Sequence, residues 1–167
     1  LRRSRGGQNV VLGTLWPQLE KIVCMDYRMS YTAQYSDILL PATQHYEKTT
    51  FNMPTPWTMF LTMSDAVAPP PGEARSEWEV LAAICRTLAA ARALESYTDR
   101  NGMVRRYDQL WDNYTLQGAL VDDQTVAADM LESSVALGNL PPETTLATFR
   151  ERGWSRYADW GLTAFAQ

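Results

Sequence analysis

Two short apolar segments, residues 22–25 and 37–41, constrain the fold of this chain more than any other feature. The first is β-prone and is followed directly by Asp26, as expected for a buried parallel strand. The second ends in proline, which closes a strand. A helical turn is predicted between them at 31–35, and residues 8–19 carry apolar side chains at helical spacing. Helices that alternate with strands predict an α/β fold with a parallel sheet.

Three further segments follow before residue 96. Residues 57–63 are apolar at alternate positions, which predicts a third strand at an edge of the sheet. The sequence AVAPPPG at 66–72 predicts a rigid, extended connector. Ser76 is then predicted to begin a helix with a capping box, because Glu79 lies three residues later, and this helix should run to about Arg92.

After Ser96 the chain changes character and predicts helices separated by polar turns. We therefore expect two regions. Residues 1–95 should form a dinucleotide-binding region, part of a doubly wound, mostly parallel, Rossmann-like sheet, and residues 96–167 a mainly helical appendage. The apolar residues at helical spacing in the appendage are Val104, Tyr107, Leu110, Trp111 and Tyr114, then Val126, Met130 and Leu131, then Leu146 and Phe149.

Composition excludes several classes of function. The net charge of -4 over 167 residues gives no bulk attraction to nucleic acid or to an anionic membrane. No apolar run approaches the ~18 residues of a membrane span. Cys24 and Cys85 are the only cysteines, form no CxxC pair, and are predicted to be buried free thiols, so we expect no metal ligand in this chain.

Four polar residues are candidates for binding a ligand beyond the carboxyl ends of the strands. Asp26 can accept two hydrogen bonds from a guanine or bind a ribose, or it is only a turn residue. Ser30 can donate to a phosphate or ribose, or only cap the following helix. Lys48 suits a pyrophosphate, or is a solvated partner of Glu47. Glu77 is favoured in the first turn of a helix with or without a ligand.

His45, the only histidine, follows the second predicted strand. It could face a substrate channel as a proton donor. No Ser or Cys with a paired base lies near it in the sequence, so a hydrolytic triad is not expected. We expect a packed or hydrogen-bonded loop histidine.

The order and spacing of these residues resemble the guanine-nucleotide-binding region of the molybdopterin oxidoreductases of the DMSO reductase family. The resemblance covers roughly residues 8–92 and includes the sequence GEARSEW at 72–78. Members of this family carry two molybdopterin guanine dinucleotides. The other residues that carry the resemblance are Val23, Asp26, Ser30, Thr32, Ala33, Asp37, Ile38, Leu39, Leu40, Pro41, Glu47 and Lys48.

This resemblance implies roles for individual residues. Asp26, Ser30, Lys48 and Glu77 would contact one of the two dinucleotides, and Met25 would contribute its backbone. Ser30 stands where the family usually has Thr, and Glu77 where Asp is commoner, so the reach of both contacts should differ. The ligand of molybdenum and the [4Fe-4S] cluster of the parent subunit would lie outside this chain. By this resemblance the chain supplies no catalytic residue or metal ligand and is inactive alone.

Finer resemblances suggest a branch and a reaction. Segments 28–30, 35–37 and 46–48 are similar to the type II branch, which includes respiratory nitrate reductase. Parts of the tail are similar to an insertion of ethylbenzene and steroid C25 dehydrogenases. We therefore expect an internal piece of a catalytic alpha subunit that hydroxylates a C–H bond of a hydrocarbon or sterol side chain with water. The alternatives are a reductase of nitrate, chlorate or selenate in the same branch, and a non-catalytic nucleotide-binding scaffold module.

The same resemblance implies partners and a compartment. Electrons would pass to iron–sulfur clusters, through an iron–sulfur beta subunit and a haem gamma subunit bound to the rest of the catalytic subunit. A small molecule would be the substrate. We expect a periplasmic enzyme, or alternatively one on the cytoplasmic face of the inner membrane.

Overall fold

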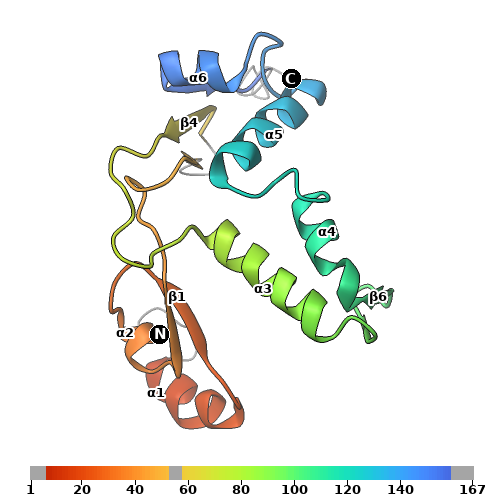
Figure 1. The fold of residues 1–167 in the computed structure, drawn as a ribbon. Coiled ribbons are helices and arrows are strands. Elements are labelled where there is room, and N and C mark those ends of the chain that lie inside the picture. The colour runs from red at the N-terminus through yellow and green to blue at the C-terminus, as the bar shows by residue number, and fades with distance from the viewer. Residues whose placement is uncertain (1–6, 53–57, 159–167) are drawn as a thin grey trace, which may run out of the picture. The chain divides into compact units, whose positions relative to one another are not determined.

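The computed structural model describes residues 7–52 and 58–158 (Figure 1). The chain divides into two compact units. Unit 1 comprises Leu1–Gln44 and Pro70–Glu77, and unit 2 comprises His45–Pro69 and Trp78–Gln167. Helices and small parallel and antiparallel sheets confirm the predicted α/β class. The division predicted at 95/96 stays a prediction.

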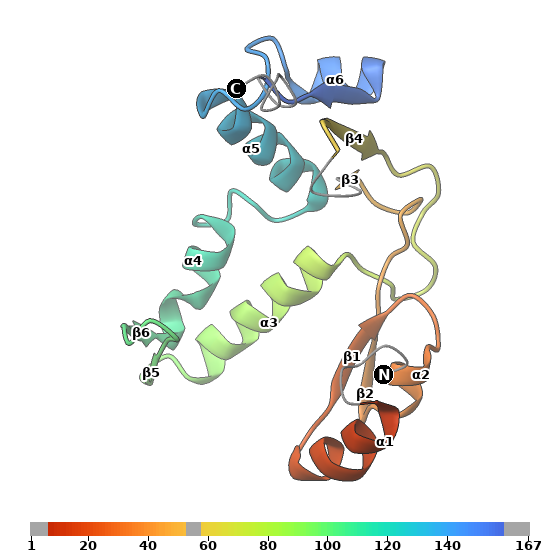
Figure 2. The same cartoon turned by 180° about the vertical axis from the view of Figure 1, so that it is seen from behind.

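The parallel pair predicted from the two apolar segments forms the centre of unit 1. Strands β1 (Val23–Asp26) and β2 (Ile38–Pro41) pair in parallel, with Val23 opposite Ile38 and Asp26 opposite Pro41. The short helix α2 (Tyr31–Gln34) lies between them in the chain, as predicted, and Figure 2 shows it beside the pair. Both strands therefore end at the same edge of unit 1.

A helical segment precedes β1, as the sequence predicts, but its geometry changes along its length. Its N-terminal turn α1 (Gln8–Val10) continues into a π-helical turn, η1 (Val11–Leu15), and a 3-10 turn, η2 (Trp16–Gln18). Pro17 fits the start of the last turn, where its missing N–H is not needed. The Trp16 indole donates to the carbonyl of Tyr35 at 2.8 Å, which fastens this segment to the end of α2.

After the proline-rich connector, the chain comes back to the edge of unit 1 where β2 ends. Arg75 forms a parallel bridge with Ala42, donates its N–H to the carbonyl of Pro41 at 3.2 Å, and accepts from the N–H of Thr43 at 3.0 Å. Helix α3 (Glu77–Ala91) starts immediately afterwards, next to the buried Ser76, as the capping pattern predicts. The first residue of α3 is thereby tied through the backbone to the end of β2.

Unit 2 contains an antiparallel sheet in the order β3 (Thr50–Asn52), β4 (Phe60–Ser64) and β7 (Trp154–Arg156). The strand predicted at 57–63 is confirmed as β4, although residue 57 lies outside the described residues. The prediction that it lies at an edge is wrong. β4 is central because β7, from the tail, pairs with its second side. The mostly parallel sheet that we predicted is thus limited to β1 and β2 among the described strands.

Helices α5 (Asp123–Ala136) and α6 (Leu146–Arg152) close the core of unit 2 against this sheet. The ring of Phe149 meets Phe51 edge-on at a centroid distance of 5.4 Å. Both helices begin with a side chain that accepts from the backbone of the first turn, as an N-cap should. The buried side chains of the core are Leu61, Leu131, Leu140 and Phe149.

The tail is mainly helical, as predicted, but its described residues also form β7 and a two-stranded hairpin. The predicted helical position Val104 is wrong, because it lies in β6 (Val104–Arg106), paired antiparallel with β5 (Ser96–Thr98). The Asp99 carboxylate accepts the N–H groups of residues 101 and 103, and Gly102 has φ 79°, so this turn folds the chain back. The helical pattern begins only afterwards, in a 3-10 turn η3 (Tyr107–Gln109) and in α4 (Leu110–Thr115).

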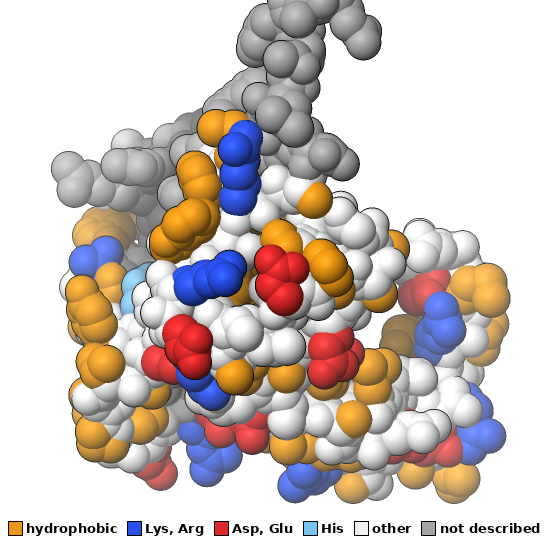
Figure 3. Space-filling model, turned by 90° about the horizontal axis from the view of Figure 1, so that it is seen from above, with side chains coloured by type: hydrophobic (Ala, Val, Ile, Leu, Met, Phe, Trp, Pro, Cys, Tyr) orange, Lys and Arg blue, Asp and Glu red, His pale blue; other side chains and the backbone are white. Residues whose placement is uncertain are grey.

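One face of the molecule carries mixed side chains. Figure 3 shows acidic, basic and hydrophobic side chains interspersed on the viewed face, without a field of one charge. Of the helices in residues 7–52 and 58–158, none has the length and apolarity to cross a membrane.

Candidate nucleotide-binding site

Asp26 ends β1 at the carboxyl edge of unit 1, where the sequence predicts it. Its Oδ1 accepts the N–H of Arg28 at 3.3 Å, a long hydrogen bond that closes the turn after the strand. No further described residue donates to the half-buried carboxylate. Its carbonyl accepts the N–H of Ala42 at 3.1 Å, which fixes its backbone to the end of β2. Asp26 therefore acts as a turn residue, one of its two predicted roles, and its Oδ2 remains available to a ligand.

Ser30 and Met25 flank this carboxylate in unit 1. Ser30 is the N-cap of α2, and its Oγ accepts the N–H of Ala33 at 3.3 Å. The capping alternative is thus confirmed, while the hydroxyl proton is still able to donate to a ligand. Met25 lies half-buried in β1 opposite Leu40, one residue before Asp26, so its backbone reaches the same edge.

Thr43 is a polar residue at this edge that the sequence analysis missed. It is 3% exposed, and its Oγ1 has no hydrogen-bond partner among the described residues. A buried unsatisfied hydroxyl costs about 1–3 kcal/mol, which a polar ligand atom would offset. The only sequence signal for a site role of Thr43 is its position two residues after Pro41, which ends the strand.

Glu77 is the first residue of α3 and is exposed. The bridge between Arg75 and Ala42 brings the start of this helix to the edge where β1 and β2 end. Unit 1 therefore combines, at one edge, two carboxylates and two hydroxyls from Asp26, Glu77, Ser30 and Thr43. Acceptors for ring N–H groups and hydroxyls for phosphate or ribose are what a nucleotide needs, so the residues present fit one.

Lys48 belongs to unit 2, whereas the other four predicted residues belong to unit 1. It is half-buried in the loop before β3. Its neighbour Thr49 is buried, at 5% exposure, and takes part in a polar network. The structure thus brings Met25, Asp26, Ser30 and Glu77 into one unit and places Lys48 in the other.

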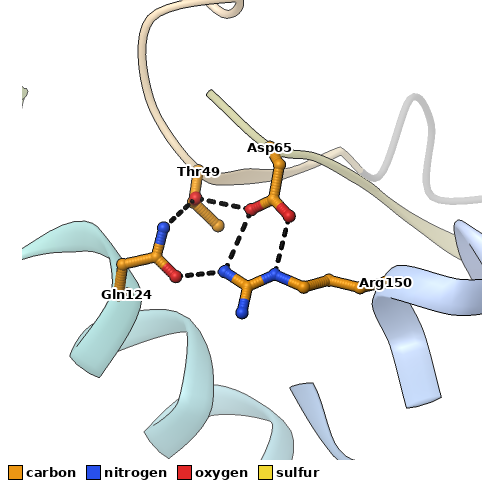
Figure 4. A network of polar contacts seen from close by, with 4 residues as sticks. All are labelled: Thr49, Asp65, Gln124 and Arg150. Atoms are coloured by element: carbon orange, nitrogen blue, oxygen red, sulfur yellow. Dashed lines mark hydrogen bonds and ion pairs between the residues drawn. The ribbon is translucent and has the colours of Figure 1, made fainter. Parts of the chain in front are cut away.

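The network beside Lys48 joins four segments of unit 2 (Figure 4). Arg150 of α6 donates two hydrogen bonds to Asp65, from Nε to Oδ2 at 2.6 Å and from a terminal N–H to Oδ1 at 3.2 Å. The Thr49 hydroxyl donates to Asp65 Oδ1 at 2.8 Å and accepts from Gln124 Nε2 at 2.6 Å. Gln124 Oε1 accepts from Arg150, which closes the ring. The bonds from Arg150 lower the pKa of Asp65 below its ordinary value.

The remaining candidates are the histidine and the two cysteines. His45 lies in an exposed turn, so its predicted loop position is confirmed and its packing is not. Cys24 and Cys85 are free thiols, as predicted, but half-buried rather than buried, and burial raises the pKa of both. In residues 7–52 and 58–158, no group of three or more His, Cys, Asp and Glu side chains is placed to hold a metal ion.

Comparisons with known proteins identify a family for the segment that carries the site. Residues 8–87 match the sequence profile of the molybdopterin oxidoreductases. The chain is 31% identical to the perchlorate reductase alpha subunit of Dechloromonas aromatica, over 92% of this chain and 16% of that protein. It is 34% identical to the respiratory nitrate reductase alpha subunit of Haloferax mediterranei, over 77% and 14% respectively. It is 33% identical to the dimethylsulfide dehydrogenase alpha subunit of Rhodovulum sulfidophilum, over 79% of this chain and 14% of that protein.

These matches confirm the predicted resemblance to molybdenum-dependent oxidoreductases and change its details. The chain spans about a sixth of the length of the perchlorate reductase subunit. Since 92% of the chain aligns with that protein, most of the tail does so too. The tail therefore does not by itself distinguish a hydrocarbon enzyme from a perchlorate reductase, and the comparisons do not support the predicted hydroxylation of hydrocarbons or sterols.

The lowered pKa of Asp65 predicts an acid-sensitive contribution to the stability of unit 2. A depressed carboxyl pKa stabilises the folded state above its unfolded value, ~3.9, and this contribution is lost as pH falls through the folded pKa. Because the Asp65 and Arg150 side chains are 36% and 39% exposed, we expect only about 0.2–1 kcal/mol.

Hydrogen exchange of α6 amides in the intact protein, measured from pH 6 to pH 3, tests this expectation. The wild type should lose protection at α6 below about pH 4, and Asp65→Asn should start lower and change less. If protection at α6 depended on pH equally in the two proteins, the acid-sensitive contribution would not come from Asp65.

Proposed function

We propose that this chain, whose residues 8–87 carry a molybdopterin oxidoreductase domain, is part of the catalytic alpha subunit of a molybdenum enzyme that reduces an oxyanion. The observation that carries this proposal is the match of 92% of the chain to a perchlorate reductase alpha subunit. The match to a respiratory nitrate reductase alpha subunit, at 34% identity, supports the same class of substrate.

In this proposal the chain holds one guanine dinucleotide of the cofactor. The Asp26 carboxylate, with Oδ2 unused by the described residues, accepts the N–H donors of the guanine edge. Ser30 and Thr43 offer hydroxyls to ribose or phosphate, and Glu77 offers a second acceptor. The contact of Lys48 with the pyrophosphate stays a prediction, because Lys48 belongs to unit 2 and the other residues to unit 1.

When bound, the molybdenum cofactor supplies two-electron oxygen-transfer chemistry, with a [4Fe-4S] cluster elsewhere in the subunit as electron carrier. The residues of this chain bind and orient the nucleotide end of the cofactor and do not react. This binding role agrees with the groups at the edge of unit 1, which form hydrogen bonds. Among the described residues there, no nucleophile contacts a base.

Exposed apolar surface on unit 1 supports a larger subunit around this chain. Parallel strands are normally covered on both faces. Yet Val23 and Ile38, which lie opposite each other in β1 and β2, are 54% and 46% exposed. We propose that the rest of the alpha subunit covers these two side chains.

We further propose that an iron–sulfur beta subunit and a haem gamma subunit bind the alpha subunit. The complex would lie in the periplasm, or on the cytoplasmic face of the inner membrane.

A dehydrogenase of the same family is the second candidate. The 33% identity to a dimethylsulfide dehydrogenase alpha subunit favours it. For a hydrocarbon or sterol substrate the only support is the tail resemblance, and most of the tail also aligns with the perchlorate reductase subunit.

Turnover assays with the full-length enzyme decide between these candidates. With a reduced viologen as donor, we expect reduction of perchlorate, chlorate, nitrate or selenate. The matched assay supplies an oxidised dye with dimethylsulfide or an alkylbenzene. Oxidation of either compound without reduction of any oxyanion would overturn the proposed reaction while leaving the cofactor site intact.

Asp26→Asn tests the cofactor site itself. The amide replaces an acceptor oxygen with a donor that faces the guanine donors, and hydrogen bonds to charged groups are worth about 1.5–3 kcal/mol. We therefore expect the full-length variant to release guanine nucleotide roughly ten- to a hundredfold faster. Glu20→Gln, an equal charge loss at an exposed position of unit 1, is the control and should release it at the wild-type rate. Wild-type retention by Asp26→Asn would remove Asp26 from the site.

Thr43→Val should have opposite effects on the cofactor-free and cofactor-bound protein. Valine matches the shape of threonine and removes a buried hydroxyl without a partner, so the cofactor-free protein should gain up to about 1–3 kcal/mol. The nucleotide should leave faster, because its partner is lost. Thermal unfolding before and after loading measures both. A stability loss in the cofactor-free protein would show that the hydroxyl is satisfied within the chain.

A further inference from the structure

We propose that a cavity of unit 2, between α3, the β5–β6 hairpin and α4, binds a small molecule that carries one carboxylate on a planar, apolar body. Both ribbon views show the end of α3, the hairpin and α4 next to one another (Figures 1 and 2). The cavity has a volume of about 330 Å³, within the range of ~300–1,000 Å³ that is typical of ligand pockets. Its lining residues are Cys85, Tyr97, Arg105, Leu110, Asn113 and Tyr114.

Every lining residue belongs to unit 2. The cavity is therefore complete within one unit, and the inference does not depend on the cofactor site proposed in unit 1.

Four of the lining side chains offer donors that the described residues leave unused. Within residues 7–52 and 58–158, the hydroxyls of Tyr97 and Tyr114 and the amide of Asn113 make no hydrogen bond. Arg105 donates from Nε to Oδ2 of Asp99 at 3.1 Å, and its terminal amino groups make no hydrogen bond to the same residues. Donors gathered around one cavity suit a ligand rich in acceptor oxygens.

The charge of the cavity favours a carboxylate over a phosphate. The N–H of Met103 and the side chain of Arg105 lower the pKa of Asp99, so this carboxylate stays ionised beside the guanidinium. Asp99 thereby offsets much of the positive charge, which leaves little attraction for a doubly charged group. The free terminal amino groups of Arg105 instead match the two oxygens of a single carboxylate.

Two aromatic rings shape the cavity before a ligand arrives. The ring of Tyr114 stacks on Trp78 at a centroid distance of 4.4 Å, and the Trp78 indole donates to the carbonyl of Leu120 at 2.8 Å. The ring of Tyr97 packs against Tyr107 at 4.9 Å. Rings held in this way form fixed apolar walls, so a planar ligand packs against them with little further ordering.

Cys85 and Leu110 complete the lining with half-buried apolar surface. Burial raises the pKa of the Cys85 thiol, so the thiol stays protonated at neutral pH and does not repel an anion. Apolar walls with a few polar groups are the usual composition of a small-molecule site.

Benzoate is the probe, and its binding to the full-length protein is measured by isothermal titration calorimetry. We expect benzoate to bind, and benzamide, which has the same shape without the charge, to bind at least about tenfold more weakly. Phenyl phosphate should bind no more tightly than benzoate. The inference is overturned if benzoate does not bind, if benzamide binds equally well, or if phenyl phosphate binds more tightly.

Two neighbouring arginines of β6 locate the binding. Arg105→Gln should weaken benzoate binding about tenfold or more, because a hydrogen bond to a charged group is lost. Arg106→Gln removes an equal charge from the next residue of the strand, which does not line the cavity and points to the other face. It should bind benzoate as the wild type does, and equal weakening by both variants would overturn the inference.

Two milder readouts remain if Arg105→Gln does not fold. Tyr114→Phe removes one hydroxyl and keeps the ring that stacks on Trp78, so benzoate should bind roughly threefold or more weakly. Benzoate should also slow the alkylation of Cys85 by iodoacetamide, followed by peptide mass spectrometry. Unchanged alkylation at saturating benzoate, or wild-type affinity in Tyr114→Phe, would place the bound molecule elsewhere and overturn the inference. Neither readout involves molybdenum or guanine nucleotide, so failure here leaves the proposed function untouched.

Discussion

The parallel pairing of β1 with β2 is the constraint on which the candidate site depends. Its register puts Asp26 opposite Pro41, so that both strands end together. Just after β2, Ala42 forms a bridge with Arg75, which places the start of α3 at the same edge. A slip of one residue would turn the Asp26 side chain to the other face of the pair. The chemistry of the edge thus follows from a backbone register more than from any single side chain.

Unit 2 is held together by contacts between segments that lie far apart in the sequence. Arg150 of α6 binds both oxygens of Asp65, which lies 85 residues earlier, and Phe149 packs against Phe51 of β3. Because the Asp65–Arg150 pair is partly exposed, its contribution to the stability of unit 2 is modest.

The sequence was most informative where local signals agreed. Strand pattern, turn residues and Pro41 predicted β1 and β2, and Ser76 correctly marked the start of α3. Strands of three residues, such as β3 and β7, are too short to show alternation, and the helical spacing of Val104 concealed a hairpin. Thr43 and the ring around Thr49 could not be predicted, because burial and pairing across tens of residues leave no local pattern.

The central claim is that this chain binds the nucleotide end of a molybdenum cofactor. The most direct test measures molybdenum by elemental mass spectrometry in the purified full-length protein, together with the guanine nucleotide released on denaturation. Molybdenum and guanine found together in the wild-type protein would support the account. Protein that folds and carries neither would contradict it, and would leave a family resemblance without its cofactor chemistry.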